Sequence, residues 1–327
     1  RTSCAVQPSQ ALGHAHCAAL RDVVLWVKVS AWPRNWAIRE SMLASVAGGG
    51  KGVLNEYDTA FLEPAQLADD RGFSPPVYRF APRPGLADVV RRYWVPVWDL
   101  APGWVSVQRV LQYPVCLVVV GNDYASLIGP TTGLATKRLT GRGWAVGVML
   151  QPAVGQRLIG ADVSTLTDGQ MDLADSGLPD VHRLVTDVRA SLTDPNDPVS
   201  RETAVAVMET ALRKLLPVDK DGIVVNAVVR AVESEAGIQR VSQICERFGV
   251  NERFLQRLSA ERIGLTPKWL IRRRRLQEAA RHLAGDASGL ADLAASLGYA
   301  DQAHFQRDFK SVTGLTPVTY ARQRGSQ

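Results

Sequence analysis

Two short segments near the C-terminal end carry side chains suited to base recognition, and a repeat relates them. Phe254-Leu255-Gln256-Arg257 in the first corresponds to His304-Phe305-Gln306-Arg307 in the second. Arg257 and Arg307 each follow an apolar residue by two positions, so on a helix each points away from the buried side. A guanidinium can donate two hydrogen bonds to guanine, and a glutamine amide can pair with adenine. The repeat therefore predicts two surfaces that contact base edges.

The residues before each segment predict a helix-turn-helix unit. In both copies a small residue stands four positions before a glycine, as Cys245 before Gly249 and Ala294 before Gly298. The small side chain lets the second helix approach the first closely, and the glycine can adopt the backbone of a tight turn. Two such units are typical of proteins that bind duplex DNA.

The residues after each segment predict where the helices end and what connects them. Gly264-Leu265-Thr266-Pro267 and Gly314-Leu315-Thr316-Pro317 each combine a helix stop with a threonine cap and a first-turn proline. Between the copies, 269–284 is expected to form one helix about 24 Å long. That length can hold two recognition helices in successive major grooves, which lie about 34 Å apart. The side chains expected to be buried in this helix are Trp269, Leu270, Leu276 and Leu283.

The positive charge of the chain is concentrated in the same region. Residues 237–327 hold 15 Lys and Arg against 8 Asp and Glu, whereas the rest of the chain holds 23 against 24. Such asymmetry favours a polyanion as the partner of the C-terminal quarter. A module for RNA or a membrane surface is disfavoured, because the paired turns predict duplex geometry and single-stranded RNA readers need exposed aromatic residues.

The C-terminal segment resembles the DNA-binding domain of the AraC/XylS family of transcription regulators. The resemblance covers about 237–322, and the second half carries the more uniform part of the pattern. Cys245 stands where alanine is usual, and Ser259 where a buried aromatic residue is usual. The matching motifs are Ile244-Cys245, Gly249, Phe254 to Arg257, Gly264 to Pro267, Arg275-Leu276 with Ala279, Leu293-Ala294, Gly298-Tyr299, Phe305 to Arg307 with Phe309-Lys310, Gly314 to Pro317 and Tyr320.

The resemblance implies which side chains contact DNA. It places base contacts at Arg253, Gln256 and Arg257 of the first recognition helix. In the second it places them at Gln302, Ala303, His304 and Arg307, where Ala303 can offer only a methyl group to thymine. Phosphate contacts are expected from Arg272, Arg273 and Lys310, while Arg275 is expected to pack or pair internally. Each base-contact residue could instead bind phosphate, since half or more of protein–DNA hydrogen bonds go to the backbone.

The preceding region predicts a separate domain rich in strands. Val115–Val120 and Tyr124–Ile128 flank a Gly-Asn-Asp turn and predict a hairpin, and Trp144–Leu150 is a further strand candidate. Helices are expected over 181–192, 198–216 and 223–232. The fold class is therefore α+β: a β-rich sandwich or barrel followed by an all-α domain with two helix-turn-helix units. The expected division is an extension at 1–73, a β-rich sensor domain at 74–178, a helical linker at 179–236 and the DNA-binding domain at 237–324.

The resemblance also implies partners. A second possibility, that the chain is an enzyme, depends on whether it contains a reactive side chain. In this family the N-terminal domain usually binds a small-molecule effector or mediates dimerisation, so an effector, a homodimer and RNA polymerase are candidate partners beside double-stranded DNA. The alternative is an enzyme, such as a repair protein, fused to a DNA-binding module. It would need a reactive cysteine, but Cys116 lies within an apolar strand and is expected to be a buried structural thiol.

No cofactor, metal or membrane segment is expected. Cys4, His14, His16 and Cys17 could in principle bind zinc, but their crowded spacing matches no familiar ligand pattern. The apolar run at 23–29 is too short to cross a bilayer. Four widely separated cysteines fit a reducing compartment, so a cytoplasmic location is expected.

Overall fold

The structure is a computed structural model that describes residues 66–67, 69, 71–110, 113–283 and 289–325. The candidate zinc ligands near the N-terminus and the apolar run at 23–29 lie outside the described residues, as does most of the expected extension.

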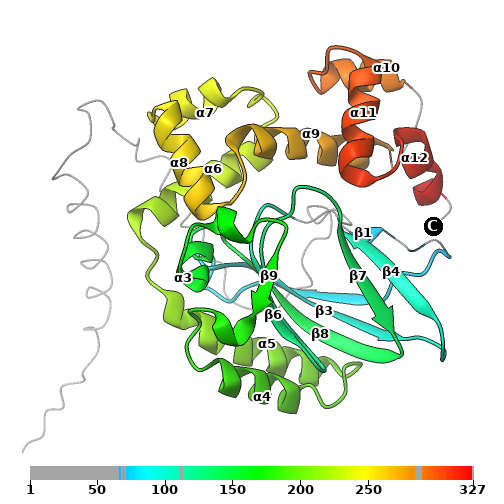
Figure 1. Cartoon of the computed structure of the whole chain (residues 1–327), viewed down its shortest axis with the longest axis vertical. Helices are drawn as coiled ribbons and strands as arrows, with labels where there is room; N and C mark the ends of the chain where they lie inside the picture. Colours follow the sequence, from blue (N-terminus) through cyan, green and yellow to red (C-terminus); the bar gives the residue numbers. More distant parts are fainter. Residues whose placement is uncertain (1–65, 68, 70, 111–112, 284–288, 326–327) are drawn as a thin grey trace, which may run out of the picture. The chain divides into compact units, whose positions relative to one another are not determined.

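The strands form two antiparallel sheets (Figure 1). The larger sheet has the order β2-β3-β8-β5-β6-β9 and the smaller one the order β1-β4-β7. The predicted hairpin is confirmed, because β5 pairs with β6 in the register Val118 to Leu127. The strands are β1 (Gln66–Leu67), β2 (Val77–Phe80), β3 (Val90–Asp99), β4 (Val105–Val110), β5 (Leu117–Gly121), β6 (Ala125–Ile128), β7 (Ala135–Thr140), β8 (Arg142–Leu150) and β9 (Gln170–Asp172).

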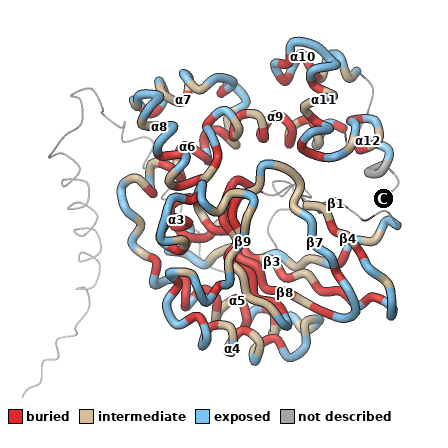
Figure 2. Tube along the Cα trace, viewed as in Figure 1, coloured by how far each residue is buried: buried red, intermediate tan, exposed pale blue. Residues whose placement is uncertain are grey.

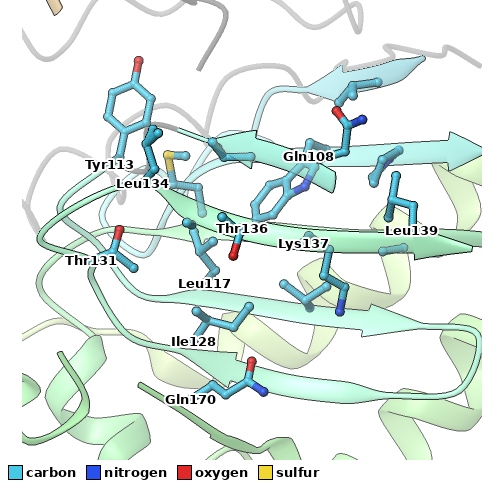
Figure 3. A pocket seen from close by; sticks show the side chains of 18 of the residues that line it. Gln108, Tyr113, Leu117, Ile128, Thr131, Leu134, Thr136, Lys137, Leu139 and Gln170 are labelled. Carbon is cyan, nitrogen blue, oxygen red and sulfur yellow. The ribbon is translucent and has the colours of Figure 1, made fainter. Parts of the chain in front are cut away.

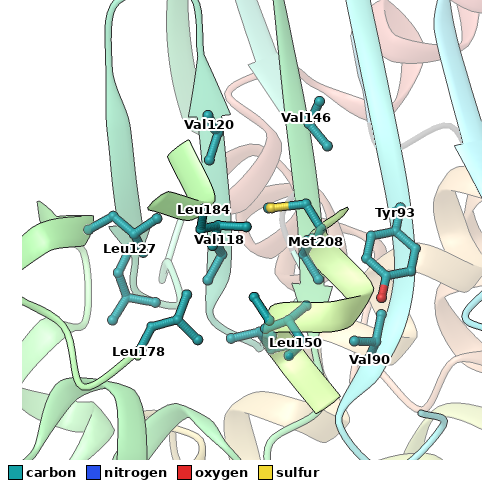
Figure 4. Close-up of a cluster of buried hydrophobic side chains, with 14 of the residues drawn as sticks. Val90, Tyr93, Val118, Val120, Leu127, Val146, Leu150, Leu178, Leu184 and Met208 are labelled. Carbon is teal, nitrogen blue, oxygen red and sulfur yellow. The ribbon is translucent and has the colours of Figure 1, made fainter. Parts of the chain in front are cut away.

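One face of the larger sheet packs on two helices and forms the main core (Figure 4). Tyr93, Val118 and Val148 point to this face and are fully buried, as expected for strands whose alternate residues share a face. Leu184 of α4 (Val181–Ser191) and Met208 of α5 (Pro198–Leu212) close the core from the other side. Figure 2 shows how buried residues concentrate in these strands.

The opposite face of the larger sheet is turned toward the smaller sheet. Trp98 of β3 and Leu139 of β7 are both buried in one cluster that joins the two sheets. The two sheets therefore form the β-rich, sandwich-like arrangement that the sequence predicts.

Helices follow the sheets for the rest of the chain. Pro198 occupies the first turn of α5 after the cap Asp197, whose carboxylate accepts a hydrogen bond from Ser200 N at 2.8 Å. The remaining α-helices are α3 (Gly155–Ile159), α6 (Lys220–Ser234), α7 (Val241–Phe248), α8 (Glu252–Arg262), α9 (Pro267–Leu283), α10 (Leu290–Ser296), α11 (Gln302–Thr313) and α12 (Pro317–Gly325). The short 3-10 helices are η2 (Val163–Leu166), η3 (Leu173–Asp175) and η4 (Arg213–Leu215).

The region expected to be a helical linker divides between two cores. Helices α4 and α5 pack on the larger sheet, whereas Val225, Val228 and Val232 of α6 pack with the first helix-turn-helix unit. Helix α6 also forms hydrogen bonds with the sheet domain. Asn226 accepts from Ala153 N at 3.0 Å and donates to Asp88 O at 3.0 Å. Helix α6 therefore joins the sheet domain to the helical C-terminal part.

Two smaller cores organise the C-terminal helices. The first contains Ile244, Phe248 and Leu255 with α6, and the second contains Phe305 and Phe309 with the last part of α9. Helix α9 has 17 residues and is about 25 Å long. It contributes Leu270 to the first core and Leu276 to the second, so one helix connects the two units.

Candidate nucleic-acid interface and a cavity in the sheet domain

The first helix-turn-helix unit consists of α7 and α8. Gly249 ends α7 in the left-handed region at φ 62°, which favours glycine. Asn251 caps α8, because its side-chain oxygen accepts from Phe254 N at 2.8 Å. Cys245 and Ser259 both lie on the inward side of the unit, Ser259 being fully buried and Cys245 partly so.

The second unit consists of α10 and α11 and repeats this construction. Gly298 lies in the turn at φ 77°, and Ala294, one of the small residues of the motif, is buried. Asp301 caps α11 by accepting from His304 N at 2.7 Å. The phenol of Tyr299 donates to Asp308 at 2.7 Å and holds the turn against α11.

A valine in place of Gly298 tests the turn. Its Cβ would lie 3.2 Å from Oε1 of Gln239, and its backbone would be strained at a φ of 77°. We expect Gly298→Val to lower the free energy of unfolding by more than about 1 kcal/mol. Gly237→Val is the control, since a Cβ there meets no atom within 4 Å. Denaturant unfolding of both variants measures the difference, and equal stabilities would contradict the assigned turn.

The predicted base-contact residues all lie on the exposed side of the two recognition helices. Arg253, Gln256 and Arg257 are exposed on α8, while the intervening Leu255 is buried. On α11 the exposed residues include Gln302, Ala303, His304 and Arg307. The predicted phosphate ligand Lys310 is exposed on the same helix. The structure thus presents these residues to solvent.

Two of these side chains have partners on their own helix. Arg257 forms an i,i+4 ion pair with Glu261 at 3.0 Å, and Gln256 donates to Glu252 at 2.9 Å. Both pairs are solvent-exposed, so each contributes only a few tenths of a kcal/mol and can exchange for a DNA contact.

Two of the expected phosphate ligands belong to the arginine run of α9 and have partners within the protein. Arg273 is only 2% exposed, and its guanidinium carbon lies 4.5 Å from the centre of the Tyr113 ring in the sheet domain. Arg272 donates to Asp308 of α11 at 2.6 Å and to Ser311 at 2.7 Å. Burial leaves Arg273 poorly placed for the predicted phosphate contact, and Arg272 is engaged within the protein.

The other two arginines of the run reach the segment before α7. Arg274 pairs with Glu278 at 3.0 Å and donates to Ile238 O at 3.1 Å. Arg275, which was expected to pair internally, donates to Gln239 O at 3.1 Å. The four consecutive arginines therefore fix α9 to the sheet domain, to the first unit and to the second.

A cavity of about 530 Å³ lies between the two sheets (Figure 3). Tyr113 and Leu134 lie at one end and Leu139 toward the other. Trp94 forms part of the wall, and its ring lies against Gly147, where a Cβ would come within 2.2 Å of ring carbons. The absence of a side chain at Gly147 thus allows the indole to lie flat on the sheet.

Among the described residues, three cationic side chains line this cavity. Arg79 of β2 lies opposite Trp94 in the strand register, and Arg92 of β3 points to the same face. Lys137 of β7 places its amine 3.7 Å from the centre of the Tyr124 ring. Burial lowers the pKa of Lys137, while Asp123 acts in the opposite direction. These residues do not stand out as a group in the sequence, although the segment from Arg92 to Trp94 lies in the region predicted to be a sensor domain.

Cys116 is not suited to nucleophilic chemistry in this structure. It is 3% exposed, and burial raises the pKa of its thiol to about 12. A reactive cysteine needs a lowered pKa and access to substrate. The interpretation of Cys116 as a buried structural thiol is confirmed.

Two family models match separate parts of the chain. Residues 244–323 match a family model described as a helix-turn-helix domain, and residues 78–172 match a domain of unknown function, DUF6597. A probable transcription factor, PqrA of Proteus vulgaris, is 32% identical over 107 residues, which cover 32% of this chain and 86% of that protein.

The chain belongs to the AraC/XylS family of transcription regulators. It is thus a DNA-binding regulator whose β-rich domain precedes the paired helix-turn-helix units. Among solved structures, apo ToxT from Vibrio cholerae gives a TM-score of 0.38 at 13% identity, covering 71% of this regulator and 97% of ToxT. ToxT with a bound unsaturated fatty acid gives 0.37 at 13% identity, covering 80% and 95%.

Two further findings concern the described part of this AraC/XylS regulator. No group of three or more His, Cys, Asp or Glu side chains with the geometry of a metal site occurs among the residues that the structure describes. Within the same residues, every helix is too short or too polar to cross a lipid bilayer.

Proposed function

We propose that this regulator places α8 and α11 in successive major grooves of duplex DNA. The observation that supports the proposal is the matched exposure of Arg253, Gln256 and Arg257 on α8 and of the corresponding side chains on α11. In both helices the exposed residues alternate with buried apolar anchors, Leu255 and Phe305. Arginine and glutamine in such positions can donate bidentate hydrogen bonds to guanine and adenine.

The second helix is proposed to contact bases through Gln302, Ala303, His304 and Arg307, with Lys310 binding a phosphate. Helix α9 positions the two recognition helices and makes no phosphate contact through Arg273, because that guanidinium is buried. Arg272 is proposed to orient α11 through Asp308 at 2.6 Å.

The sheet domain is proposed to bind a small molecule that changes DNA affinity. The cavity supports this role, since about 530 Å³ is within the usual size of ligand pockets and its walls combine apolar surface with a few polar groups. The contact of the cavity residue Tyr113 with Arg273 of α9 offers a route from that site to the DNA-binding part.

Three finer assignments are part of this proposal. They are a second copy of the chain, RNA polymerase as a partner at the promoter, and a cytoplasmic location. The buried thiol of Cys116 favours a regulator without enzymatic activity.

Genomic binding-site mapping with the purified full chain tests the proposed function. We expect enriched sites that contain two short conserved blocks one helical turn apart. Affinity for such a site should fall steeply as salt rises, because phosphate contacts release counterions. Binding without sequence preference, or a single conserved block, would contradict two-groove recognition.

Replacing Arg307 separates base recognition from backbone binding. If Arg307 contacts a guanine, Arg307→Ala should cost about 1–3 kcal/mol on the mapped site and much less on scrambled DNA. Lys310→Ala is the matched control on the same helix. It should weaken both DNAs by similar factors and reduce the salt slope by about one. Competition binding at two salt concentrations measures both, and equal losses for Arg307→Ala on the two DNAs would make Arg307 a phosphate ligand.

A further inference from the structure

The charge on the cavity walls narrows the chemistry of the molecule that would bind there. Arg91 and Arg92 are neighbours on β3, but only Arg91 has a carboxylate partner among the described residues. Arg91 forms a bidentate pair with Glu233, with nitrogen–oxygen distances of 2.6 and 3.1 Å. Arg92 lines the cavity, and among the described residues no carboxylate pairs with it or with Arg79.

Asp168 is the one carboxylate that the described residues place in the wall, and it does not neutralise these cations. Asp168 uses both of its oxygens on Thr132, accepting from the backbone nitrogen and from the hydroxyl at 2.7 Å each. Arg79, Arg92 and Lys137 therefore give the cavity a net positive lining. Arg92 is half-buried without a carboxylate partner among the described residues, whereas Arg79 and Lys137 are more exposed. Burial of a cation without a counter-charge is unfavourable, and an anionic ligand at Arg92 would offset that cost.

Much of the remaining wall is apolar. Trp94 lies against the sheet at Gly147, and Leu117, Ile128 and Met149 continue this surface. Such a surface suits an aromatic or aliphatic body, since indole faces offer a large contact area with little loss of side-chain freedom.

We propose that this cavity binds an organic anion with an apolar body, whose anionic head is held by Arg79 and Arg92. This inference rests on the proposed role of the sheet domain as an effector site and specifies the ligand chemistry of that site. Burial lowers the pKa of Arg92, and the nearby Arg91 and Arg79 act in the same direction, whereas Tyr113 opposes them. A bound anion would relieve this repulsion between like charges.

The position of the head group also connects the cavity to the DNA-binding part. The guanidinium carbon of Arg92 lies 4.8 Å from the centre of the Tyr113 ring, and that of Arg273 lies 4.5 Å from the same centre. Leu134, another cavity residue, packs against the core of the second unit. An anion that draws Arg92 toward itself changes the packing of Tyr113. Because Arg273 of α9 packs on the same ring, the position of α9 changes as well.

Binding of acids and their uncharged analogues to the full chain tests the ligand class. The probes are biphenyl-4-carboxylate with biphenyl-4-methanol, and dodecanoate with dodecanol, so the two pairs also distinguish aromatic from aliphatic bodies. Titration calorimetry should show at least one acid binding about tenfold or more tighter than its alcohol. Arg92→Gln should abolish this preference, whereas Arg138→Gln, an exposed neighbour of Lys137 on β7, should retain it. Equal binding of acid and alcohol, or no saturable binding of either acid, would overturn the proposal.

Affinity for the mapped DNA site provides the second readout. The preferred acid should change this affinity about fivefold or more, and DNA should change the acid's affinity by the same factor. Arg273→Met should keep the acid's affinity within about twofold and remove the coupling. An acid that binds without changing DNA affinity would overturn the relay through Tyr113. If an alcohol shifted DNA affinity as strongly as its acid, an effector site would remain but the anion assignment would fail. Failure of the parent chain to bind DNA would instead contradict the proposed function.

Discussion

Phe309→Ala is expected to unfold the second helix-turn-helix unit and to abolish specific DNA binding. Phe309 is fully buried, and its ring lies 5.8 Å from that of Phe305 and 5.4 Å from that of Tyr320. Truncation of such a residue costs about 3–5 kcal/mol, because both apolar contact and edge-to-face ring packing are lost. The core of this unit is small, so a loss of that size removes most of its stability.

Hydrogen exchange locates the effect within the chain. We expect amides of α10 to α12 to lose protection in Phe309→Ala, while those of β3 and β8 keep theirs. Val318→Ala is the control, since Val318 is 43% exposed on α12 and its truncation should change stability by less than about 0.5 kcal/mol. Unchanged protection of α11 in Phe309→Ala would show that the ring cluster does not hold this unit together.

Asp219 is the second position at which one substitution should have a large effect. One carboxylate oxygen accepts from Gly222 N at 2.7 Å and caps α6, and the other accepts from Arg262 at 2.7 Å. The Arg262 side chain is only 10% exposed. Asp219→Ala should therefore lower the free energy of unfolding by about 2–4 kcal/mol, from the lost cap and the lost charge-assisted hydrogen bond.

Asp219→Asn separates the two contributions. Asparagine caps helices about as well as aspartate, so this variant should lose only the part due to the ion pair. Burial by itself would raise the pKa of Asp219, but the hydrogen bonds from Arg262 and Gly222 N outweigh it and hold the pKa below its ordinary value.

The lowered pKa fixes the sign of the pH dependence. A carboxyl whose folded pKa is depressed stabilises the protein above its unfolded pKa, which is about 4, and loses that contribution as pH falls through the folded value. The stability difference between the parent and Asp219→Asn should be constant near pH 7 and shrink below about pH 4. Denaturant unfolding across this range measures it. A difference that grew on acidification would mean that the ion pair does not stabilise the fold.

The DNA-binding units could be predicted from the sequence because their signals are local. Gly249 and Gly298 occupy left-handed turns, and Asn251 and Asp301 cap the recognition helices through their own neighbours. Each of these turns and caps depends on a few consecutive residues, and each occurs in both helix-turn-helix units. The exposure of Arg257 and Arg307 followed from helix periodicity alone.

The arginine run and the cavity depend on contacts between distant residues. Nothing near Arg273 in the sequence indicates that it packs on Tyr113, 160 positions earlier. The sequence also does not predict β3 as a strand. Both faces of β3 lie inside the domain, one against helices and the other along the cavity. Its alternation therefore places Arg92 and Trp94 beside apolar residues and does not give a polar face. Residues 111–112 and 284–288, which flank parts of these contacts, lie outside the described residues.

The attachment of α9 on three sides limits the operators that this regulator can use. Because Arg272, Arg273 and Arg274 hold different neighbours, α9 cannot turn about its axis without breaking one of these contacts. The two recognition helices consequently keep a fixed angular relation. Each base pair inserted between the half-sites rotates the second by about 35° around the duplex. Operators should therefore tolerate substitutions in the spacer far better than a change in its length, and a spacer altered by half a helical turn should present its second half-site on the opposite side of the DNA.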